Sequence, residues 1–166
     1  ITESFPGQFR NWFYAMLAMS TVLRREPPFK TIFGYATLFG EDGRPMHKSW
    51  GNAIEFDEAA ERMGADVMRW LYAGQNVKEN LRFGYGLSDE ITRRLLTLWN
   101  TYSFFVTYAN LDGFDPTKTP AVPAQERGEL DRWILARLHE LVQLSTREMD
   151  DFGVATVTRQ IEAFVE

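Results

Sequence analysis

Residues 43–52, which read Gly-Arg-Pro-Met-His-Lys-Ser-Trp-Gly-Asn, are the stretch around which the fold of this chain is interpreted. Residues 29–39 before it are rich in aromatic and β-branched side chains and predict a buried strand. Residues 56–63 after it predict a helix, with Asp57 as its N-cap. The stretch is therefore a loop that leaves a strand end and leads into a helix, which is where α/β sheets bind their ligands.

This loop carries the groups that bind polyphosphates. Lys48 is a compact charge on a flexible stem, and Ser49 and the backbone amides add hydrogen-bond donors. The Walker pattern Gly-x-x-x-x-Gly-Lys-Ser/Thr is absent from the sequence, so a phosphate site here is of another type. The alternative is a solvated surface turn, because Glu-Asp-Gly-Arg at residues 41–44 makes a turn without any ligand.

Composition limits the class of protein. The 166 residues allow one compact domain or parts of two, and 13 Phe and 5 Trp within 45% hydrophobic residues support a packed core. The chain has no Cys and only two His, His47 and His139, so we expect no disulfide and no metal site. No apolar run approaches the roughly 20 residues that span a bilayer, and no signal pattern opens the chain. We expect a cytoplasmic protein without membrane contact.

The charges are divided unequally between the two halves. Residues 1–86 hold 10 basic and 10 acidic side chains, whereas residues 87–166 hold 8 and 13 and supply the whole net charge of −5. A strongly basic footprint for nucleic acid is therefore missing. The chain begins at Ile1 and ends at Glu166 inside a predicted helix, so we expect it to be a segment from the middle of a longer protein.

Helices dominate the remainder of the chain. Apolar residues recur at helical spacing over residues 8–23, with Trp12 and Phe13 interpreted as core. A short helix is predicted over 65–73 and a connector over 74–86. Three further helices, interpreted as an antiparallel bundle, are predicted over residues 88–111, 129–149 and 154–165.

Four ordered stretches resemble the class I aminoacyl-tRNA synthetases, and the isoleucyl-tRNA synthetases in particular. Residues 46–52 (Met-His-Lys-Ser-Trp-Gly-Asn) resemble that family's Lys-Met-Ser-Lys-Ser-Leu-Gly-Asn loop. Residues 64–70 (Gly-Ala-Asp-Val-Met-Arg-Trp) are similar to the segment that follows this loop, and residues 8–14 (Gln-Phe-Arg-Asn-Trp-Phe-Tyr) to an Asp-Gln-x-Arg-Gly-Trp-Phe element. Residues 130–138 resemble the opening of a helix in the anticodon-binding domain.

The resemblance implies an enzyme that joins isoleucine and ATP, with Mg²⁺, into an adenylate and passes the acyl group to tRNA. It implies Lys48 as the catalytic cation and Glu3 and Gln8 as residues facing the adenylate. The implied ATP-binding residues are Met46, His47, Lys48 and Ser49. The chain departs from the family loop at Pro45, which stands in place of the first lysine, and at His47, which replaces a serine. His47 can add a donor or a second charge below its pKa.

The resemblance also implies the fold and the partners. The predicted fold is mainly α with a small α/β part. Residues 1–86 would be the C-terminal portion of a Rossmann-type catalytic domain, and residues 87–166 the start of a helical, antiparallel anticodon-binding bundle. The partners implied are isoleucine-accepting tRNA, ATP and isoleucine, and the expected state is a monomer. The segment alone should be inactive, because the family's other nucleotide motif, His-x-Gly-His, is absent from its sequence.

Two alternatives remain open on the sequence. One is a valyl-tRNA synthetase, which the Gln-x-Arg-x-Trp-Phe run at residues 8–13 disfavours. The other is a non-catalytic module, derived from a synthetase, that binds tRNA or another protein.

Overall fold

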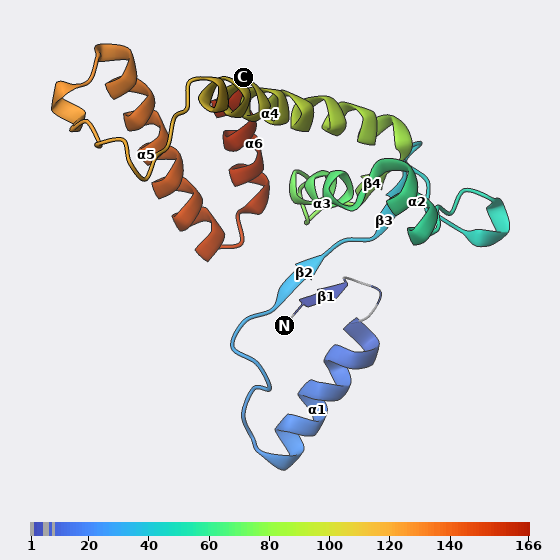
Figure 1. Cartoon of the computed structure of the whole chain (residues 1–166). Helices are drawn as coiled ribbons and strands as arrows, with labels where there is room; N and C mark the ends of the chain where they lie inside the picture. Colours follow the sequence, from blue (N-terminus) through green and yellow to red (C-terminus); the bar gives the residue numbers. More distant parts are fainter. Residues whose placement is uncertain (1, 5–6, 8) are drawn as a thin grey trace. The chain divides into compact units, whose positions relative to one another are not determined.

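The computed structural model describes residues 2–4, 7 and 9–166 and divides into two compact units, one up to Ser88 and one from Asp89 to Glu166. It is mainly helical with a small amount of strand, as predicted (Figure 1). In the first unit the elements are β1 Thr2–Ser4, η1 Phe9–Phe13, α1 Tyr14–Leu23, β2 Phe33–Tyr35, β3 Leu38–Gly40, η2 Lys48–Trp50, α2 Phe56–Met63, α3 Ala65–Ala73 and β4 Leu81–Phe83. From there α4 Tyr85–Leu111 leads into the second unit, with η3 Ala124–Glu126, α5 Glu129–Asp150 and α6 Val154–Val165.

The single strand expected over residues 29–39 is two short strands in two different sheets. β1 and β2 pair in parallel, with Glu3 opposite Gly34, and β3 and β4 pair in parallel, with Phe39 opposite Arg82. The predicted connector over 74–86 therefore contains a strand, β4. The formation of a strand depends more on the partner strand than on the intrinsic β-propensity of its residues. A strand of three residues is also too short to show a periodic pattern in the sequence.

Two short helices and β4 form the core of the first unit. The buried apolar residues that they contribute are Ala59, Met63, Met68, Leu71 and Phe83. The ring of Phe83 stacks on Tyr72 at 5.5 Å between centroids. α2 begins at Phe56, so Asp57 lies within its first turn and is not the N-cap that we predicted. An acidic side chain there still favours the helix, because it faces the positive end of the helix dipole.

The N-terminal helix differs from its prediction in two respects. A π-helical turn, η1, precedes α1, and Phe13 in that turn is buried, with its ring 5.0 Å from Phe9 and 5.3 Å from Phe29. Trp12 was expected in the core with Phe13, but 47% of it is exposed. The i→i+5 hydrogen bonds of a π-turn change the angular step per residue, so a buried face predicted on a 3.6-residue period does not apply to this turn.

The three predicted helices of the C-terminal part are present. α5 and α6 pack against each other and run in opposite directions after the break at Asp151–Gly153 (Figure 1). α4 begins at Tyr85, three residues before the Ser88 start that we predicted, and it carries exposed aromatic side chains that include Trp99 and Phe104. The antiparallel bundle as a whole stays a prediction. None of the described helices is long and apolar enough to cross a membrane.

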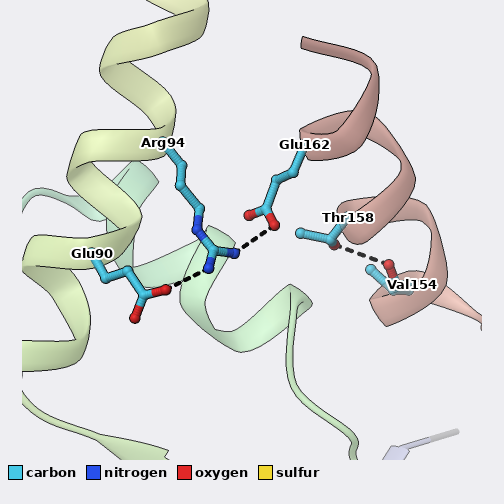
Figure 2. A network of polar contacts seen from close by, with 5 residues as sticks. All are labelled: Glu90, Arg94, Val154, Thr158 and Glu162. Atoms are coloured by element: carbon cyan, nitrogen blue, oxygen red, sulfur yellow. Dashed lines mark hydrogen bonds and ion pairs between the residues drawn. The ribbon is translucent and has the colours of Figure 1, made fainter. Parts of the chain in front are cut away.

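A charged side chain links α4 to α6 within the second unit. Arg94 donates one hydrogen bond to Glu162 at 2.6 Å and another to Glu90, one turn earlier in α4 (Figure 2). The Glu162 side chain is only 13% exposed, and next to it on α6 lie the buried residues Val157 and Thr158. Charge-assisted bonds gain strength where water is excluded, so this contact holds α6 to the first part of α4.

Replacing Arg94 by Met should lower the free energy of unfolding by about 1.5–3 kcal/mol, which is the typical contribution of hydrogen bonds to charged groups. Arg93→Met is the matched control, since Arg93 is an exposed arginine on the same helix. Urea unfolding followed by circular dichroism measures both. Equal losses in the two variants would contradict the assignment of this contact.

Candidate functional site

The predicted loop leaves the end of β3 through a tight turn. The Gly43 amide donates to the Gly40 carbonyl at 2.9 Å, and the Gly40 amide donates to the Arg44 carbonyl at 2.8 Å. Gly43 has a φ of +77°, a left-handed conformation that glycine adopts without strain. Phe39 and Pro45 then form an isolated antiparallel bridge, so the chain folds back beside the strand that it has just left.

Asn52 closes the segment that follows, residues 45–52, which we call the Lys48 loop. Its Oδ1 accepts a hydrogen bond from the His47 amide at 2.9 Å, and its Nδ2 donates to the Pro45 carbonyl at 2.9 Å. Both partners are backbone groups, so this one side chain sets the path of the loop without depending on the side chains at 45 and 47.

A 3₁₀ turn, η2, carries the chemical groups of the loop. The Trp50 amide donates to the His47 carbonyl at 3.0 Å, and the Gly51 amide donates to the Lys48 carbonyl at 3.2 Å. Gly51 ends the turn at a φ of +68°. The rings of His47 and Trp50 lie 4.4 Å apart. The turn therefore presents Lys48 and Ser49 side by side, and both are exposed.

Lys48 has an acidic partner. Its Nζ lies 2.9 Å from Oε1 of Glu55, and the two side chains are 83% and 64% exposed. The hydrogen bond to Glu55, and then the negative charge of that carboxylate, raise the pKa of Lys48 above its usual value. The ammonium is therefore charged at neutral pH. An exposed pair of this kind contributes little to stability, so a more highly charged anion can displace Glu55 from Lys48.

The structure brings together four of the six predicted site residues. Met46, His47, Lys48 and Ser49 are consecutive on the Lys48 loop, where Met46 is half-buried and the other three are exposed. Glu3 lies in β1, in the sheet that does not contain β3. Gln8 lies outside the described residues.

Two residues of the site were missed by the sequence analysis. Asn52 ends the quoted stretch, and an amide side chain at a loop end is a known way of satisfying backbone groups. The position of Asn52 at the end of the loop is therefore a signal that the sequence contains. Glu55 gave no signal, because only the folded loop places it against Lys48.

The arrangement suits the binding of an anion. It offers one charged ammonium and a neighbouring hydroxyl on a loop with fixed ends. Among the described residues, no group of three His, Cys, Asp or Glu side chains lies close enough to hold a metal ion.

Replacing Glu55 by Gln should lower the pKa of Lys48 toward its usual value, because the carboxylate that stabilises the charged ammonium is lost. The stabilisation from this pair is present at neutral pH and disappears as the pH rises through the raised pKa of Lys48. An NMR titration of the Lys48 side chain measures the shift. Glu61→Gln is the control, since Glu61 is an exposed glutamate on α2. The same Lys48 titration in wild type and Glu55→Gln would contradict the pairing.

Comparison with known proteins places the chain in a family. Residues 4–84 match the family model of the tRNA synthetases class I (I, L, M and V). The chain is 37% identical to the isoleucine–tRNA ligase of Thermus thermophilus over 98% of its own length and 16% of that protein. It is 39% identical to the isoleucine–tRNA ligase of Deinococcus radiodurans over 96% of its length and 15% of that protein.

A third relative, the isoleucine–tRNA ligase of Bacillus thuringiensis, is 35% identical over 99% of the chain and 17% of that protein. The chain thus spans about one sixth of the length of the relatives that it matches. The family model covers the Lys48 loop and both elements that flank it, and the relatives cover the helices as well. The chain belongs to the class I tRNA synthetases.

Proposed function

We propose that the chain is part of an isoleucine–tRNA ligase and that it supplies the loop that binds the phosphates of ATP. The observation that carries this proposal is the exposed ammonium of Lys48, held on a clasped loop at the end of β3, within a segment that aligns with isoleucine–tRNA ligases over nearly its whole length. In this reaction the carboxylate of isoleucine attacks the α-phosphate of ATP. The bond to the β-phosphate breaks, and pyrophosphate leaves.

Lys48 would act on the departing pyrophosphate. Negative charge grows there as the bond breaks, and a fixed cation that meets this growing charge lowers the barrier. Lys48 must first leave Glu55, and the exposure of their ion pair makes that exchange inexpensive. Ser49 and His47 would add donors beside it, and Met46 lies next to them in the same loop.

The other parts of the chain are assigned by their similarity to the family. Residues 1–86 would complete a Rossmann-type catalytic domain, in which Glu3 and Gln8 face the aminoacyl-adenylate. Residues 87–166 would begin the helical anticodon-binding domain, whose partner is isoleucine-accepting tRNA. ATP enters with Mg²⁺ as a substrate. We propose that the complete protein is a monomeric enzyme of the cytoplasm.

A second candidate is a synthetase-derived module without catalysis. The observation that favours it is the loss of a charge, because Pro45 stands where the family loop has its first lysine and Lys48 is left paired with Glu55. An enzyme and a module differ in one measurement, isoleucine-dependent ATP–pyrophosphate exchange. Valine dependence in the same assay would indicate the valyl alternative.

In the complete ligase, Lys48→Ala should slow this exchange by roughly a hundredfold or more, as the removal of a charge-stabilising donor does elsewhere. The loss should fall mainly on kcat, because the contact strengthens in the transition state. His47→Ser should have a smaller effect.

The matched control is Lys78→Ala, which removes an exposed lysine from the same unit. Unchanged exchange in Lys48→Ala would overturn the assignment of the loop. A complete protein without any exchange would favour the module.

A further inference from the structure

The first turn of α4 is held by a side chain from far away in the sequence. The Gly86 amide donates a hydrogen bond to Oε2 of Glu41 at 3.2 Å, across 45 residues. The first amides of a helix have no acceptor within the helix, and a carboxylate placed there also faces the positive end of the helix dipole. Glu41 thus caps α4 from the residue that directly follows β3.

The sequence leaves room for this carboxylate. A Cβ atom at Gly84 or at Gly86 would collide with the side chain of Glu41. Neither glycine has a positive φ, so their role is to admit Glu41 and not to adopt a left-handed backbone. The two glycines on either side of Tyr85 therefore form a seat for one carboxylate.

The pairing of β3 with β4 explains why Glu41 reaches this seat. Gly40 lies opposite Phe83 at the end of the parallel ladder. The next residue of each strand is Glu41 on one side and Gly84 on the other. Parallel strands end at the same edge of a sheet, so these two residues leave it side by side.

The same helical turn is also held from the other side of the loop. The Tyr85 hydroxyl donates to Oε1 of Glu58 at 2.9 Å, and the guanidinium of Arg62 lies 3.6 Å from the centre of the Tyr85 ring. Glu58 and Arg62 belong to α2, the helix that follows the Lys48 loop. The end of β3 before the Lys48 loop and α2 after it, which we call the two arms of the loop, therefore both contact the first turn of α4. The first arm contacts Gly86 and the second contacts Tyr85.

We propose that Glu41 is a positioning residue for the Lys48 loop, which it holds in place by joining the strand before the loop to the first turn of α4. The hydrogen bonds of Asn52 set the shape of the loop, whereas the two arms set where the loop stands. Losing Glu41 frees one arm, while Tyr85 still holds the other. The proposal rests on the function proposed above only in its consequence for catalysis.

The cap itself is tested by amide exchange in the 166-residue chain. Glu41→Ala should speed exchange at the Gly86 amide about fivefold, the change expected from a lost helix cap. Glu41→Gln keeps an acceptor oxygen and should retain most of the protection. The control is Glu61→Ala on the exposed face of α2, which should leave Gly86 unchanged. Equal exchange at Gly86 in Glu41→Ala and wild type would overturn the proposal.

The positioning is tested on the loop. Glu41→Ala should shift the backbone NMR signals of residues 47–51 while the helical circular dichroism stays constant, and Glu41→Gln should restore them. Faster exchange at Gly86 with loop signals identical to those of wild type would make Glu41 a structural cap only and would overturn the proposal. If Glu41→Ala does not fold, Gly86→Ala crowds the carboxylate out of its seat while keeping a good helix former, and the same two outcomes decide.

The catalytic consequence is measured in the complete ligase. Glu41→Ala should lower kcat of pyrophosphate exchange several-fold with the KM for isoleucine unchanged, and Glu41→Gln should recover it. If Glu41→Ala lowers the rate of pyrophosphate exchange and Glu41→Gln does not restore it, positioning through the Gly86 amide would be contradicted. The NMR readouts do not depend on activity, so a failure of the Lys48 assignment remains distinguishable from a failure of this one.

Discussion

The parallel pairing of β3 with β4 is the constraint on which the rest of the first unit depends. Parallel neighbours cannot be joined by a tight turn, so the chain between Gly40 and Leu81 must cross over. The Lys48 loop, α2 and α3 are that crossover. Because the ladder ends at Gly40 and Phe83, the loop and α4 leave the same edge of the sheet. The position of the site is thus a result of strand register, although each strand is only three residues long.

The site combines a loop backbone that is firmly held with a lysine side chain, Lys48, that is weakly held. Backbone hydrogen bonds to Asn52 close the loop, and the arms on both sides reach the first turn of α4. Lys48 in contrast is held by Glu55, through an exposed ion pair. This arrangement suits a cation that changes its partner. The backbone of the loop keeps its position while the long side chain of Lys48 exchanges one anion for another.

The helices could be predicted well from the sequence, whereas the short strands could not. Helices over 65–73 and 154–165 have a periodic apolar face, and their observed bounds match the prediction. β4 carries no such pattern, and its pairing depends on residues 43 positions away. The start of α4 was misplaced for the same reason. Ser88 resembles a cap, yet the acceptor at Gly86 comes from Glu41, and Ser88 is a buried residue inside the first turn. The local motif identified Lys48, but the pairing of Lys48 with Glu55 can be seen only in the folded chain.

We propose that Lys48 exchanges Glu55 for a phosphate group when the substrate binds. The most direct measurement is an NMR titration of the chain with magnesium pyrophosphate, following the side chain of Lys48 and the backbone amide of Ser49. We expect saturable shifts at both residues, and tighter binding in Glu55→Gln because the competing carboxylate is gone. Signals of Lys48 and Ser49 that stay constant as pyrophosphate is added, in wild type and in Glu55→Gln alike, would contradict it.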